Sequence, residues 1–169
     1  MISIIITIIS FALDILFSNL LPFMKGDLSL FTPLLVPITI YLVYPFYQNK
    51  EKYYLIYSII VGIIYDLIFT NLLFVNGIIF LMLGVITIKL NKTFEVNKYT
   101  NIINITFIII LYEAFFAGLI FVLHLVPITI SSVIYKITHT LIMNIIYGMI
   151  LYLIVDKITV KYKKVFINK

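Results

Sequence analysis

Six runs of mostly apolar residues, separated by short polar stretches, take up nearly the whole chain. A helix needs about 20 such residues to cross the hydrocarbon layer of a bilayer, and most of the runs approach that length. Only 11% of the residues are charged, compared with about 25% in a soluble domain. The chain is therefore expected to be an all-α membrane protein, in which residues 1–169 form one polytopic bundle of six transmembrane helices.

The boundaries of the six predicted helices follow the apolar runs. The helices are expected at residues 2–23, 31–47, 53–73, 76–90, 101–125 and 132–156, and a basic tail is expected at 157–169. The fourth helix is short, so the sequence does not decide whether it crosses the bilayer fully. Pro33 suits the first turn of the second helix, whereas Pro37 lies deeper, lacks a backbone donor and predicts a bend near that end.

The lysines are distributed unevenly between the predicted loops, and the chain contains no arginine. If the N-terminus lies inside, ten lysines face the cytoplasm, and only Lys25 and Lys136 face outside. This excess agrees with the positive-inside rule and predicts an N-in, C-in protein of the bacterial cytoplasmic (inner) membrane. The net charge of +5 is attributed to this topology, and no nucleic-acid partner is expected.

The basic tail at 157–169 alternates five lysines with apolar residues. Such a segment can lie against anionic lipid headgroups, where each lysine contributes about 1 kcal/mol of attraction. Two other interpretations of the tail stay open. It is either a solvated end that only reflects the topology, or a docking site for a cytoplasmic partner.

Three acidic residues lie near the middle of the predicted spans. Asp14 begins the phrase Asp-Ile-Leu-Phe-Ser-Asn-Leu-Leu, and Asp66 begins the closely similar phrase Asp-Leu-Ile-Phe-Thr-Asn-Leu-Leu. Glu113 likewise has Phe three residues later and Leu six residues later. All three lie about 12 residues, or roughly 18 Å, from the inner ends of their helices. A carboxylate at the bilayer centre costs roughly 2.5–3.5 kcal/mol, so these side chains are expected to face protein. The similar phrases lie on helices that run in the same direction, which predicts a parallel repeat of helices.

A polar stripe follows one face of the predicted sixth helix at four-residue spacing. It consists of Lys136, Thr140, Asn144 and Gly148, and it is flanked by His139 and Tyr147. Our hypothesis is a buried cluster in which this stripe meets Asp14, Asp66 or Glu113. The alternatives are plain interhelical hydrogen bonds worth about 0.6 kcal/mol each, a proton or ligand site, and a partner interface. Lys136 could also simply snorkel to the outer surface.

Residues that would indicate catalysis are sparse. The chain has no cysteine, which excludes disulfides and thiolate chemistry. Asp14 and Asp66 could form an intramembrane aspartyl-protease pair only within hydrogen-bond reach, and the Asn-plus-Asp motifs of lipoprotein signal peptidases are absent. His124 and His139 lie on different predicted helices with no third metal ligand nearby. We therefore predict a protein that is not an enzyme and holds no cofactor or metal.

One stretch of the chain has a recognisable pattern. Gly62-Ile-Ile-Tyr-Asp66 lies in the third helix, and Asn71-Leu-Leu-Phe-Val-Asn76-Gly77 leads into the fourth. Thr32-Pro33-Leu34-Leu35 opens the second helix. Together these segments resemble the MreD family, in which a Gly-x-x-x-Asp phrase is followed by a short turn and a Leu-Asn-Ala-like helix start. The chain departs from the pattern at Phe74, where the family often has a turn glycine.

The resemblance implies a non-catalytic scaffold and regulator of the cell-elongation complex, which builds peptidoglycan in the lateral wall. It implies binding to an MreC-like protein and, indirectly, to MreB, RodA and a class B penicillin-binding protein. The packing or interaction residues would then include Gly62, Asp66, Asn71, Asn76 and Gly77.

The alternative is the substrate-binding subunit of an energy-coupling-factor vitamin transporter, a small six-helix membrane protein to which MreD is similar in fold. A vitamin binder needs an outer pocket with aromatic and hydrogen-bonding residues. The chain has no tryptophan, and its first helix lacks the Ala-x-x-x-Ala pattern expected of a coupling helix. Both features favour the MreD-like interpretation.

Overall fold

All regular structure in the described part of the chain is helical, as the apolar runs predict. The computed structural model describes residues 2–20, 32–70, 74–94, 97–124 and 129–167. The helices are α1 (Ile2–Leu20), α2 (Leu35–Val43), the 3-10 helix η3 (Tyr44–Tyr47), α3 (Glu51–Phe69), α4 (Val75–Thr93), α5 (Lys98–Val122) and α6 (Ile130–Ile167). Five of them, all except α2 and η3, are long and apolar enough to cross a membrane.

The short helix α2 forms the centre of the bundle. Each of its nine residues is buried, and it packs against α1, α4, α5 and α6. At a rise of 1.5 Å per residue, α2 is only about 14 Å long, roughly half the thickness of the hydrocarbon layer. A helix that is enclosed in this way needs hydrogen-bond acceptors from the protein for the backbone donors of its first turn.

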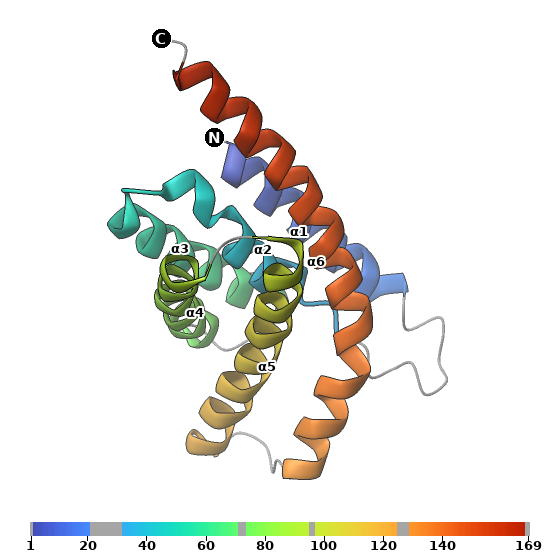
Figure 1. Cartoon of the computed structure of the whole chain (residues 1–169). Coiled ribbons are helices and arrows are strands. Elements are labelled where there is room, and N and C mark those ends of the chain that lie inside the picture. Colours follow the sequence, from blue (N-terminus) through green and yellow to red (C-terminus); the bar gives the residue numbers. More distant parts are fainter. Residues whose placement is uncertain (1, 21–31, 71–73, 95–96, 125–128, 168–169) are drawn as a thin grey trace.

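The long helices surround α2 in antiparallel pairs. α3 and α4 lie side by side as one hairpin, and α5 pairs with α6 as another (Figure 1). The beginning of α1 and the end of α6 lie at one end of the bundle, together with η3, the end of α4 and the beginning of α5 (Figure 1). We call this end the basic end, because the helix termini there contain Lys50, Lys52, Lys92 and Lys98. At the opposite end, α5 and α6 extend beyond α3 and α4 (Figure 1).

The second helix begins later than predicted. Residues 32–34 precede α2, so the prediction of a helix over 31–47 is wrong at its start. Pro37 consequently lies in the first turn of the helix, where the missing backbone N–H would have no intrahelical partner in any case. Because α2 begins this late, Pro37 interrupts no backbone hydrogen bond of the helix, and the reason for the expected bend no longer applies.

The fourth and sixth helices are longer than predicted. α4 covers Val75–Thr93 rather than 76–90, which gives it enough length to cross a membrane. α6 continues to Ile167, so the described part of the predicted tail at 157–169 is a helical extension. That segment contains no glycine or proline that would end the helix.

The remaining boundaries differ by a few residues. α3 begins at Glu51, and α5 begins at Lys98 because Asn97 caps it. The side-chain oxygen of Asn97 accepts a hydrogen bond from the backbone N–H of Thr100 at 2.8 Å. The predicted helix ends at 21–23, 71–73 and 125 lie outside the described residues.

Candidate functional site

Asp14 caps the N-terminus of α2, although it belongs to α1. Its Oδ1 atom accepts a hydrogen bond from the backbone N–H of Leu35, and its Oδ2 atom accepts one from Val36, both at 3.0 Å. Leu34, in the N-cap position, offers no side-chain cap of its own. The Asp14 side chain is fully buried. The carboxylate therefore satisfies two enclosed donors and faces the positive end of the α2 dipole.

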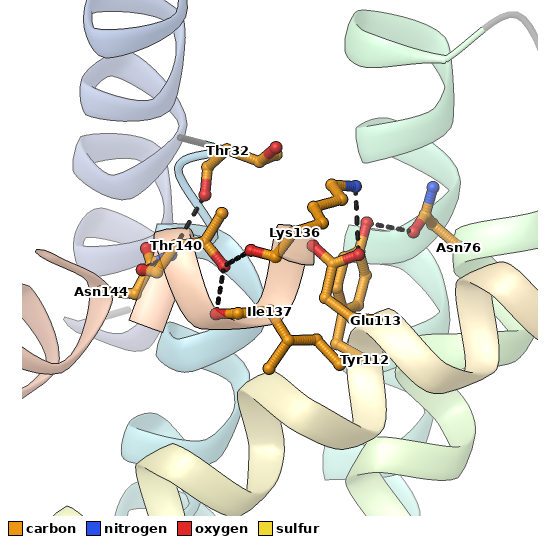
Figure 2. Close-up of polar contacts among 8 residues, drawn as sticks. All are labelled: Thr32, Asn76, Tyr112, Glu113, Lys136, Ile137, Thr140 and Asn144. Atoms are coloured by element: carbon orange, nitrogen blue, oxygen red, sulfur yellow. Dashed lines mark hydrogen bonds and ion pairs between the residues drawn. The ribbon is translucent and has the colours of Figure 1, made fainter. Parts of the chain in front are cut away.

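Asn144 on α6 completes this cap. Its Oδ1 atom accepts a hydrogen bond from the backbone N–H of Leu34 at 2.9 Å, and its Nδ2 atom donates to the carbonyl oxygen of Thr32 at 3.1 Å (Figure 2). Because Pro37 has no N–H, the first turn of α2 has no backbone donor without a partner. Asp14 and Asn144 together replace the local N-cap side chain that α2 lacks.

Asp66 on α3 has the same function for α4. Its Oδ2 atom accepts a hydrogen bond from the backbone N–H of Asn76 at 2.9 Å, and its Oδ1 atom accepts one from Asn76 Nδ2 at 2.7 Å. Thr70 Oγ1 donates another to Oδ1 at 2.8 Å. The hydroxyl of Tyr112 on α5 donates to Asn76 Oδ1 at 3.0 Å (Figure 2). This buried network joins α3, α4 and α5.

Asp14 and Asp66 are thus equivalent in structure as well as in sequence. Each lies on one helix and accepts hydrogen bonds from the backbone in the first turn of the following helix, Asp14 from two N–H groups and Asp66 from one. A buried helix N-terminus favours a carboxylate because the unpaired N–H groups and the helix dipole are both positive there. The prediction that both carboxylates face protein is confirmed, since both side chains are fully buried.

Gly62 allows α3 to approach α4 closely beside this network. A Cβ atom on Gly62 would lie 2.4 Å from the carbonyl oxygen of Asn76 and 2.7 Å from the Cα atom of Gly77, which is too close for real atoms. A Cβ atom on Gly77 would meet the side chain of Ile63 at 3.2 Å, a milder contact. The phrase Gly62–Asp66 therefore places the close approach and the helix cap one turn apart on the same face of α3.

Phe74 has a left-handed backbone conformation, which is the conformation that a turn glycine at this position of the family pattern would adopt easily. Its φ is 71° and its ψ is −5°, in the left-handed region. A side chain is disfavoured there, whereas glycine adopts this conformation freely. The carbonyl oxygen of Phe74 accepts a hydrogen bond from the N–H of Ile78 at 3.1 Å, so this strained residue also starts α4.

Glu113 and Lys136 link α5 to α6. Lys136 Nζ lies 3.0 Å from Glu113 Oε2 (Figure 2), and the side chain of Glu113 is 3% exposed while that of Lys136 is 35% exposed. The ammonium group also lies 5.6 Å from the centre of the Phe116 ring, within the range of a cation–π interaction. Glu113 Oε1 is buried without a hydrogen-bond partner among the described residues. Lys136 is therefore paired with an acid and does not simply extend to the surface.

Replacing Lys136 with methionine is expected to lower the free energy of unfolding by about 1–2 kcal/mol, because buried Glu113 loses its charge partner. Membrane insertion should be unaffected. The double variant Glu113→Gln, Lys136→Met should recover most of the loss, since it removes both charges. Reversible unfolding in mixed detergent micelles, followed by circular dichroism, measures these values. Equal losses in the single and double variants would contradict the pairing.

The structure brings only part of the predicted cluster together. Asn144 meets the cap formed by Asp14, whereas Asp66 bonds to Thr70 and Asn76 instead of the α6 stripe. Thr140 Oγ1 donates to carbonyl oxygens of its own helix, those of residues 136 and 137 (Figure 2).

One residue that flanks the predicted stripe lies away from these contacts. His139 is exposed and its Nδ1 atom lies 2.8 Å from the carbonyl oxygen of Tyr135. The reason is that consecutive helix residues are rotated by about 100°, which turns His139 away from Thr140. Asn71, a packing candidate from the family resemblance and not from the cluster, lies outside the described residues.

A polar face on α1 was not predicted. It comprises Ser3, Thr7, Ser10 and Asp14, which recur at spacings of four, three and four residues and are all buried. Ser10 Oγ lies 2.7 Å from Thr39 Oγ1 on α2 and 2.8 Å from the Tyr147 hydroxyl on α6. The spacing was visible in the sequence. The signal is weak because a serine or threonine can satisfy itself on a carbonyl of its own helix, as Ser10 does with Ile6.

The chain is similar to known proteins over most of its length. The family model of the rod shape-determining protein MreD matches residues 1–162. The curated cell shape-determining protein MreD of Streptococcus pneumoniae (strain ATCC BAA-255 / R6) is 25% identical over 122 residues, which cover 70% of this chain and 73% of the relative. No solved structure gives a significant match. The matched range, residues 1–162, spans Asp14, Asp66, Glu113 and the residues that they contact.

Proposed function

The chain belongs to the MreD family of rod shape-determining membrane proteins, and on this premise we propose that it is a non-catalytic scaffold and regulatory subunit of the bacterial cell-elongation complex. The family match over residues 1–162 carries the proposal. The relative in Streptococcus pneumoniae is named for the determination of cell shape. In this role the chain organises the enzymes that build peptidoglycan along the lateral wall.

The contacts of the buried acids support a structural role. Asp14 and Asp66 hold the N-termini of α2 and α4, and Glu113 holds α6 through Lys136. In each case the carboxylate joins two helices instead of facing an open site. Polar side chains that bridge helices in this way stabilise one arrangement of a membrane bundle. A defined arrangement of helices suits a subunit that holds its partners in a fixed relation.

In the proposed orientation the basic end faces the cytoplasm, both termini lie inside, and the protein resides in the bacterial cytoplasmic (inner) membrane. Ten of the twelve lysines then lie on the cytoplasmic side. Five helices are long enough to cross a membrane, and the shorter apolar segment Leu35–Tyr47 is the proposed sixth crossing, whose helical part does not span the full hydrocarbon layer by itself. Lysines at the end of α6 attract anionic lipid headgroups. Similarity to the substrate-binding subunits of energy-coupling-factor transporters stays a prediction.

An MreC-like protein is the proposed direct partner, and MreB, RodA and a class B penicillin-binding protein are indirect partners. Affinity purification of the tagged chain from native membranes is expected to recover the MreC-like protein in a near-stoichiometric amount. Depletion of the chain is expected to turn rod-shaped cells into rounded ones, which microscopy measures. An unrelated tagged protein with several membrane spans is the control.

The same purification separates this proposal from the runner-up. Recovery of a pair of ATPase subunits without any wall-synthesis protein would contradict the scaffold function and support the alternative, a subunit of a vitamin transporter. Normal rod shape after depletion would count against a role in elongation.

A further inference from the structure

The basic end of the bundle contains a cavity of about 200 Å³. It lies between the end of α2, η3, the last turns of α4, the first turns of α5 and the second half of α6. Its lining residues are Tyr41, Leu42, Pro45, Gln48, Asn91, Asn101, Tyr152, Val155, Asp156 and Thr159. Pockets for drug-sized ligands usually measure about 300–1,000 Å³, so this cavity has room for one long side chain rather than for a whole cofactor.

The inner wall of the cavity is already organised by hydrogen bonds. The Tyr41 hydroxyl donates to Asn101 Oδ1 at 2.7 Å and accepts from Asn104 Nδ2 at 3.0 Å. Asn101 Nδ2 donates to the carbonyl oxygen of Asn97 at 3.0 Å. These bonds hold the aromatic and amide groups in place, so little ordering is needed when a ligand enters.

Asp156 gives the cavity an unpaired negative charge. Its side chain is exposed, and it has no hydrogen bond or ion pair among the side chains that the structure describes. The four other described acids, Asp14, Glu51, Asp66 and Glu113, all have such partners. Asp156 is therefore the described carboxylate that is free to bind a cation from outside the chain.

Further acceptors and apolar surface accompany this charge. Asn91 uses its Nδ2 atom to donate to the carbonyl oxygen of Thr87 at 3.0 Å, which leaves its Oδ1 as an acceptor. Gln48 and Asn91 lie at the C-terminal ends of η3 and α4, where the helix dipole favours positive charge. Leu42, Pro45 and Val155 supply an apolar wall. The cavity thus combines acceptors and partial negative charge with a surface for an aliphatic stem.

We propose that this cavity binds the side chain of one arginine from a cytoplasmic segment of a partner protein. The planar guanidinium group donates in a fork to the Asp156 carboxylate and stacks on the tyrosine rings of the lining. The aliphatic part of the side chain packs against Leu42 and Val155. The chain itself contains no arginine, so this side chain comes from a second protein. The inference goes beyond the proposed function and can fail independently of it.

A phospholipid amine fits the same place less well. In a headgroup such as ethanolamine, the ammonium is tethered a few bonds from a phosphate. No lysine is among the described residues that line the cavity, so that phosphate would lie near the Asp156 carboxylate without a positive charge from this lining to balance it. A protein side chain brings the positive charge alone.

The test uses the full chain in nanodiscs of phosphatidylcholine and phosphatidylglycerol, with carbon-13 labels on leucine and valine methyl groups. The probe is an acetylated, amidated pentapeptide with one arginine between glycine and serine residues. We expect saturable shifts of the Leu42 and Val155 methyl signals. The apparent affinity should be roughly tenfold higher than that of the glutamine peptide, in which glutamine replaces the arginine, because one charge-assisted interaction contributes about that much. Equal affinities for the arginine and glutamine peptides would overturn the proposal.

Two variants test whether Asp156 is responsible for the preference for the arginine peptide. Asp156→Asn is expected to remove the preference for the arginine peptide while the thermal unfolding temperature stays unchanged, since Asp156 is exposed. Glu51→Gln is the matched control, because Glu51 lies at the same end but pairs with Lys92 at 2.8 Å and does not line the cavity. It should keep the preference. An equal loss in both variants would show a general charge effect and refute the site.

A third arm tests the lipid. In nanodiscs that contain phosphatidylethanolamine, the arginine peptide is expected to bind as before. If this lipid shifts the Leu42 and Val155 signals and blocks the peptide, the occupant is a lipid amine and the proposal is wrong.

Discussion

Replacing Asp14 with leucine is expected to lower the free energy of unfolding by about 4 kcal/mol. The substitution leaves the backbone N–H groups of Leu35 and Val36 buried without an acceptor, at about 1–3 kcal/mol each. Leucine is apolar and of similar size, so it favours membrane insertion and leaves no large cavity. A loss of stability would therefore report on the missing cap of α2. Reversible unfolding in mixed detergent micelles measures it.

Two further variants control for this result. Asp14→Asn keeps one acceptor oxygen and should lose about half as much stability, because one of the two N–H groups stays bonded. Leu16→Ala on the same helix should change little, since Leu16 is more than half exposed in the described bundle. If Asp14→Leu unfolds at the wild-type detergent concentration, the cap contributes nothing and the explanation of the repeated phrase fails.

The variant Gly62→Ala is expected to destabilise the bundle by about 3 kcal/mol, at the upper end for an overpacked contact. The added Cβ atom would lie 2.4 Å from the carbonyl oxygen of Asn76, which is backbone and cannot rotate away. α4 must then shift from α3, and this shift stretches the bonds between Asp66 and Asn76. The same unfolding measurement gives the loss.

Gly118→Ala on α5 is the matched control for Gly62→Ala. A Cβ atom there would have no neighbour within 4 Å, and Gly118 lies inside a helix. The alanine should therefore raise stability by up to about 1 kcal/mol through its helix propensity. The two substitutions are chemically identical and are expected to have opposite signs. A gain in stability at Gly62 would show that the helices are not in close contact there.

Some parts of the candidate site could be predicted because they depend on the free-energy cost of placing a single polar residue in lipid. A carboxylate within an apolar run is expensive in lipid, so the burial of Asp14 and Asp66 followed from their positions. The contact between Asp66 and Asn76, ten residues apart across a turn, was not predicted, because Asp66 was expected to meet the stripe of α6. His139 was misplaced because it is adjacent in sequence to the stripe, while helix geometry turns it outward.

The contacts between residues far apart in the sequence had no signal from which they could be predicted. Asp14 binds residues 21 and 22 positions away, and Asn144 binds Leu34 across 110 positions. The late start of α2 belongs with them, because Leu35 can begin a buried helix only where α1 and α6 supply acceptors. The cavity at the basic end is similar, since its lining brings residues 41–48 together with residues 91, 101 and 152–159.

The sequence by itself determined the membrane class, the order of the helices and the polar groups that lipid would not tolerate. These properties depend on the hydropathy of each residue and on spacing along one helix. Only the tertiary structure decided which acceptor serves which helix end, that the shortest α-helix lies at the centre, and where a charged cavity remains. The physical reason is that these contacts depend on how side chains from distant helices pack together, and packing is a property of all the helices at once.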